Sequence, residues 1–62
     1  MQVNQAFIVQ LLSRSRNGNL PETRLCQWYS VRFARSTFNA ALAALIDAGM
    51  VERIAPFHVR LK

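Results

Sequence analysis

The chain has 62 residues, 52% of them hydrophobic, and eight basic residues against three acidic ones give it a formal charge of +5. This length fits a single domain over residues 1–62, with a small core and a thin stability margin. No apolar run reaches the roughly 18 residues that a membrane-spanning helix needs, so the composition argues against a membrane-spanning protein.

The sequence contains one cysteine, Cys26, and one histidine, His58. A single cysteine forms no internal disulfide, and these two residues are too far apart in the chain to make a metal-site motif. The first residues lack a basic segment before their apolar stretch, which argues against a secretory signal. We therefore expect a cytoplasmic protein without a cofactor or metal, stabilised by core packing or by forming a homodimer.

The basic residues are the most informative part of the composition, since seven of the eight are arginine. The planar guanidinium fork of arginine suits phosphates and the edges of guanine bases. Many arginines on a small domain indicate a nucleic acid partner, and less often an anionic membrane or an acidic protein. An ordinary solvated surface is the alternative interpretation.

A first helix is predicted from Gln5 to about Ser15, with Asn4 as its N-cap. The segment Asn17–Asn19 then marks a turn, and no hairpin is expected there because the flanking residues do not alternate. One face of this helix is apolar, with residues at i, i+1, i+4 and i+5: Phe7, Ile8, Leu11 and Leu12.

A second helix is predicted from about Pro21, which suits the first helical position, to about Tyr29. Leu25, Trp28 and Tyr29 are expected to share one face, and both aromatic side chains are expected in the core. The alternative for this aromatic pair is a contact with DNA through one ring. Cys26 is expected to be a small buried hydrophobic residue. Two apolar residues of the following connection are expected to fill the angle between helices: Val31 and Phe33.

A third helix is predicted to begin near Ala34 or Arg35 and to end before Gly49, because glycine readily adopts the left-handed conformation that terminates helices. Its outer face is expected to be partly basic at the start and rich in alanine beyond. Its inner face is apolar at i, i+4, i+7 and i+8, which predicts contact with the core: Phe38, Leu42, Leu45 and Ile46.

The segments 50–54 and 57–62 are predicted to form a β-hairpin that turns at Ala55-Pro56. In the second strand, alternation predicts that Phe57, Val59 and Leu61 face the core. The outer face is then basic: His58, Arg60 and Lys62.

The order of three helices followed by a hairpin resembles that of winged helix-turn-helix DNA-binding proteins. The segment RSTFNAALAALIDAGMVER, residues 35–53, is similar to the stretch that many small bacterial, phage and plasmid regulators carry. The resemblance implies an α+β, mostly α fold: a three-helix winged helix-turn-helix with a short C-terminal β-hairpin wing.

The resemblance also implies which residues would contact DNA. The third helix, about residues 35–48, would enter the major groove, with base contacts from Arg35, Ser36, Thr37 and Asn39. Phosphate contacts would come from the wing and from basic residues elsewhere in the chain: Arg14, Arg16, Arg24, Arg32, Arg53, His58, Arg60 and Lys62.

We therefore expect a sequence-specific transcriptional regulator that binds double-stranded DNA as a homodimer. The alternative is a winged-helix protein-interaction module, a subunit or inhibitor of a larger machine, that uses the alanine-rich face of the third helix around Ala40 and Ala43. An enzyme is not expected, because the three acids have no paired spacing for acid–base chemistry: Glu22, Asp47 and Glu52.

Overall fold

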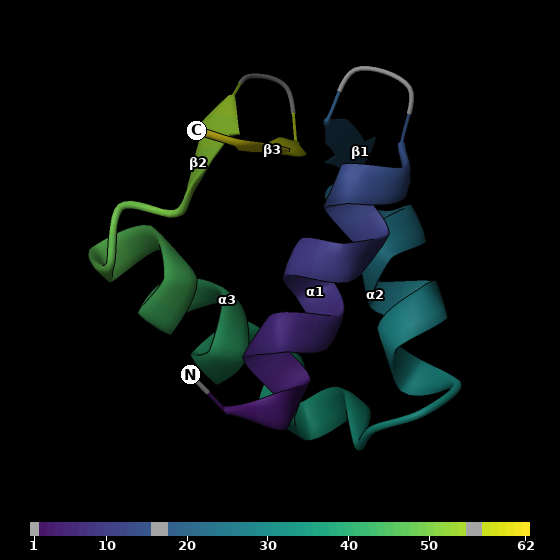
Figure 1. The fold of residues 1–62 in the computed structure, drawn as a ribbon. Coiled ribbons are helices and arrows are strands. Elements are labelled where there is room, and N and C mark those ends of the chain that lie inside the picture. Colours follow the sequence, from purple (N-terminus) through teal and green to yellow (C-terminus); the bar gives the residue numbers. More distant parts are fainter. Residues whose placement is uncertain (1, 16–17, 55–56) are drawn as a thin grey trace.

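Within the part of the chain that the structure describes, the fold consists of three helices and three short strands. Figure 1 shows how they are arranged. The computed structural model describes residues 2–15, 18–54 and 57–62. The predicted α+β, mostly α class with a C-terminal hairpin is confirmed. In chain order the elements are α1 (Val3–Arg14), β1 (Asn19–Pro21), α2 (Glu22–Ser30), the 3-10 turn η1 (Arg35–Thr37), α3 (Phe38–Asp47), β2 (Val51–Ile54) and β3 (His58–Leu61).

The antiparallel sheet has the strand order β1-β3-β2, so the last strand lies in the middle. β2 and β3 pair as predicted, with Glu52 opposite Arg60, while the predicted turn residues Ala55 and Pro56 lie outside the described residues. β1 was not predicted; its Leu20 lies opposite Val59. Pro21 was predicted to be the first residue of the second helix, but it is the last residue of β1, and α2 begins at Glu22. An edge strand tolerates proline because one side of its backbone needs no ladder hydrogen bond.

The core lies between the helices and one face of the sheet. The apolar faces predicted for the first and third helices are confirmed, with Ile8, Leu12, Leu42 and Leu45 almost completely buried. Ile46 is partly buried and packs against them. The sheet contributes buried side chains from each of its three strands: Leu20, Val51 and Val59. Within the described ranges, no helix has the length and apolar character needed to cross a membrane.

Three apolar side chains that were predicted to be buried are exposed. Trp28 is 43% exposed, because successive helical residues are about 100° apart and its neighbours Leu25 and Tyr29 take the core positions. Val31 is 87% exposed at the end of α2, whereas Phe33 packs against the core. Phe57 is 80% exposed. Its φ of 58° places it in the turn, so the alternation begins one residue later than predicted.

The helix boundaries differ by a few residues from those predicted. α1 begins at Val3, with Gln2 in the N-cap position, and ends at Arg14. Asn4, the predicted N-cap, lies in its first turn and donates from its side chain to the hydroxyl of Tyr29. α3 ends before Gly49, which has the predicted left-handed conformation with a φ of 74°.

Tyr29 is fully buried and joins α2 to three other elements. Its hydroxyl lies 2.5 Å from Oγ1 of Thr37, which in turn donates to the backbone carbonyl of Ala34 at 2.6 Å. Because Thr37 uses its proton for Ala34, Tyr29 is the donor in their shared bond. The Asn4 side-chain amide donates to the Tyr29 oxygen at 3.3 Å. The ring is surrounded by three phenylalanines, at centroid distances between 5.3 and 6.5 Å: Phe7, Phe33 and Phe38.

Removing either partner of the hydroxyl pair should destabilise the fold. We expect Tyr29→Phe and Thr37→Val each to lower the free energy of unfolding by about 1 kcal/mol, because each loses a hydrogen bond at the junction. The double variant should lose clearly less than the sum, since both changes remove the same bond. Urea denaturation measures all three values. Thr23→Val is the control for losing an exposed hydroxyl, and additive losses at Tyr29 and Thr37 would contradict the shared bond.

Candidate nucleic-acid interface

A groove of about 610 Å³ lies between α2 and the segment formed by η1 and α3. Arg35 and Asn39, two of the predicted base-contact residues, both line it. The opposite wall comes from α2 and supplies a carboxylate, two hydroxyls, a thiol and an amide: Glu22, Thr23, Ser30, Cys26 and Gln27. The structure therefore brings the arginine and asparagine predicted to read bases together with polar groups of the preceding helix.

The other two predicted base-contact residues have different surroundings. Arg35, Ser36 and Thr37 form the turn η1 rather than the first turn of α3, which begins at Phe38. Ser36 is exposed. The hydroxyl of Thr37 is already hydrogen-bonded to the Tyr29 hydroxyl and the Ala34 carbonyl, so this side chain stabilises the fold.

The outer face of α3 carries no positive charge. Asn39, Ala40, Ala43 and Asp47 are exposed on it, and Ala44 is half-buried. α3 itself contains no basic residue, so the nearest cation in sequence is Arg35 in the preceding turn. The polar side chains on this side of the molecule that could contact a ligand are therefore concentrated where α3 begins.

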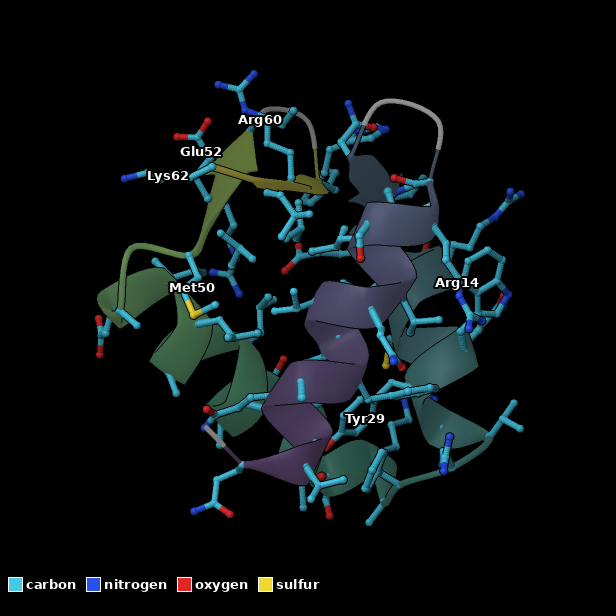
Figure 2. All side chains as sticks on the ribbon, viewed as in Figure 1. Arg14, Tyr29, Met50, Glu52, Arg60 and Lys62 are labelled. Carbon is cyan, nitrogen blue, oxygen red and sulfur yellow. The ribbon has the colours of Figure 1, made fainter. Side chains whose placement is uncertain are left out.

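Two arginines of the hairpin are paired with glutamates. Arg53 donates from Nε to Oε1 of Glu22 at 3.1 Å, which ties β2 to the start of α2. Arg60 forms an ion pair with Glu52, its cross-strand neighbour. Figure 2 shows this second pair and Lys62 together on the hairpin. Both arginine side chains remain more than half exposed, so these ion pairs are weak. Each arginine can therefore exchange its glutamate for another anion.

His58, which was also predicted to contact phosphate, is half-buried in β3. It lies opposite Pro21 of β1 on one side and opposite Ile54 of β2 on the other. The strand alternation placed it on an outer basic face with Arg60 and Lys62. Arg60 and Lys62 are indeed exposed.

The remaining predicted phosphate contacts do not lie with the hairpin. Figure 2 shows Arg14 on the side of the molecule that carries α2, across the fold from Arg60 and Lys62. Arg32 follows α2 and lies over the ring of Phe7 in α1, 5.5 Å from its centroid. Arg24 is exposed on α2, and Arg16 lies outside the described residues. The predicted contacts are therefore divided between two regions of the surface.

Sequence reasoning missed the contribution of α2 to the groove. Thr23, Gln27 and Ser30 lie at i, i+4 and i+7, which places them on one polar face of the helix. This spacing was available in the sequence as a signal. Cys26, predicted to be buried, is half-buried and takes part both in the groove and in packing against the core.

The pair between Glu22 and Arg53 leads to a stability prediction. Glu22→Gln should lower the free energy of unfolding by about 0.5 kcal/mol in low salt, and the loss should shrink in about 1 M salt, which screens exposed charges. Asp47→Asn is the matched control, because it also removes one acid but has no ion pair within the described residues. Denaturation at both salt concentrations measures the difference. Equal losses in the two variants would contradict a contribution from the pair.

The described part of the chain contains no group of three or more His, Cys, Asp or Glu side chains that could hold a metal ion. No protein-family model matches the chain, and no match was found among curated proteins or solved structures. Function must therefore be inferred from the arrangement of the side chains themselves.

Proposed function

We propose that the protein is a sequence-specific DNA-binding transcriptional regulator in which η1 and the start of α3 contact the major groove. The observation that carries this proposal is the groove in which Arg35 and Asn39 lie together beside polar side chains of α2. The order of three helices with α3 directly before a hairpin supports it, since winged helix-turn-helix proteins share this order.

The chemistry of the two groove residues suits base recognition. An arginine can donate two hydrogen bonds to O6 and N7 of guanine, and an asparagine can bond N6 and N7 of adenine. Arg35 and Asn39 are both exposed and line the same groove. Thr23 and Gln27 can bond phosphate oxygens, which fixes the position of the helices on the duplex without reading sequence, whereas the Ser30 hydroxyl already donates to the backbone carbonyl of Cys26 at 2.7 Å.

In this proposal, the hairpin adds affinity through phosphate contacts. Lys62 is exposed at its end. Arg53 and Arg60 would reach phosphates by leaving Glu22 and Glu52, and exposed pairs of this kind are worth only about 0–1 kcal/mol. The two glutamates therefore reduce the contribution of the hairpin to DNA binding without preventing it.

One copy offers few base contacts, so we further propose that a homodimer reads two half-sites of a pseudo-palindrome in the cytoplasm. Two linked modules bind a double site much more tightly than one module binds a half-site, because the second contact becomes intramolecular. The symmetry of the preferred sequence tests this part of the proposal directly.

A second candidate function is a winged-helix module that binds another protein through α3. The exposed side chains Ala40 and Ala43 support it, because small residues allow another backbone to approach closely. The absence of basic residues from α3 and the acid at its end, Asp47, also favour a protein over a phosphate backbone at that part of the helix.

Selection from a random duplex pool should enrich a short palindrome. Arg35→Ala should weaken binding to the enriched site by roughly tenfold to a hundredfold and relax its preference at one base pair, because a bidentate contact is worth about 1–3 kcal/mol. Lys62→Ala is the matched control. It should weaken binding to all duplexes alike and reduce the salt slope by about 0.9, as loss of one phosphate contact does.

Two results would contradict the proposal. Equal binding of the wild-type protein to every duplex would exclude sequence recognition. No gel shift at low salt would exclude DNA as the partner and favour the protein-interaction module, which substitution of Ala43 by a large residue would then test.

A further inference from the structure

A second basic surface lies away from the groove and the hairpin. We call it the α1–α2 surface and define it by Arg14, Arg24, Trp28 and Arg32. Arg14 ends α1 on the side that carries α2. Arg24 and Trp28 are spaced at i and i+4 on one side of α2, and Arg32 follows two residues after the helix ends. The contact of Arg32 with Phe7 places this side of α2 next to α1.

Trp28 is the only tryptophan of the chain, and 43% of it is exposed. Exposure of a large aromatic ring keeps apolar area in water, which folding normally removes. Its helix neighbours Leu25 and Tyr29 are fully buried, so Trp28 remains at the edge of the core with part of its ring in solvent. A flat apolar ring between two arginines is suited to stacking on a base.

The positive charge of this surface is not compensated by nearby acids. Glu22 and Glu52 are paired with the hairpin arginines, and the third acid, Asp47, ends α3. No ion pair within residues 2–15, 18–54 and 57–62 involves Arg14, Arg24 or Arg32. Arg32 lies over the Phe7 ring, a contact that orders a guanidinium while its edge can still donate. The surface therefore combines three available cations with one stacking ring.

We propose that the α1–α2 surface binds single-stranded nucleic acid, with Trp28 stacking on an unpaired base and the arginines contacting the flanking phosphates. A duplex would use the cations but not the ring, because its bases are already stacked on one another. Arg24 precedes Trp28 by about one turn of α2, and Arg32 follows Trp28 just beyond the end of the helix, so an arginine on each side of the ring could contact the phosphates that flank a stacked base. This site is separate from the groove of Arg35 and does not depend on the proposed regulator function.

Trp28 is the one tryptophan of the chain, so its fluorescence reports on this surface. Titration of the full chain with oligo(dT) at low salt should quench the emission, and a blunt duplex of the same length should quench it much less. The logarithm of the binding constant should fall with the logarithm of salt concentration with a slope near −2, about −0.7 for each of three arginine–phosphate contacts on a single strand. No quenching by oligo(dT), or equal quenching by the duplex, would overturn the proposal. Quenching only by an acidic polypeptide such as polyglutamate would also overturn it.

Variants test the ring and the arginines of this surface. With labelled oligo(dT) and anisotropy detection, Trp28→Ala should weaken binding roughly tenfold, the loss of one base stack. Arg24→Gln should reduce the salt slope by about 0.7. Phe57→Ala, which removes another exposed aromatic ring, is the matched control for Trp28→Ala and should leave oligo(dT) binding unchanged, and circular dichroism checks that each variant is folded. Unchanged oligo(dT) binding in folded Trp28→Ala and Arg24→Gln would overturn the proposal. If the random duplex pool yielded no enriched sequence while Trp28→Ala and Arg24→Gln still weakened oligo(dT) binding, only the proposed regulator function would be contradicted.

Discussion

The arrangement of the three helices depends on the buried side chain of Tyr29. Its ring contacts phenylalanines from α1, α3 and the connection between α2 and η1, and its hydroxyl bonds Thr37 in η1 and Asn4 in α1. A polar group inside a small core is tolerated because each of its hydrogen-bonding partners is present. Since η1 carries Arg35 and leads into Asn39, the bond from Tyr29 to Thr37 also ties to α2 the segment that lines the other side of the groove.

The helices could be predicted from the sequence because their apolar residues recur at helical spacing, and the hairpin because Val59 and Leu61 alternate with polar residues. β1 could not, since three residues are too few to show a period and their partner strand comes almost forty positions later. Spacing placed Trp28 and Tyr29 together, but only one of two adjacent helical residues can face the core. Of the candidate site, Arg35 and Asn39 were assigned through the resemblance of residues 35–53, whereas the bonds of Thr37 and the pairing of Arg53 with Glu22 arise from tertiary contacts.

The distribution of charge is as informative as its total. Two of the arginines nearest the proposed duplex site are held by glutamates, so the field at the hairpin is weaker than the composition indicates. The arginines of the α1–α2 surface have no such partners among the described acids. A formal charge of +5 therefore does not identify one binding face, because the fold neutralises part of one region and leaves another uncompensated.

The central position of β3 has a consequence for the order of folding. β1 and β2 do not pair with each other, and both obtain their ladder hydrogen bonds from residues 58–61. β1 is synthesised before α2 and α3 but stays without a partner until β3 has been made, so the long-range pairing that closes the sheet must come after local helix formation. The β2–β3 hairpin is close in sequence and can form early, as the helices can, whereas the packing of α1 on α3 and the pairing of β1 with β3 join distant parts of the chain. β3, the last of the described strands to be synthesised, is thus the strand that joins β1 to the rest of the sheet.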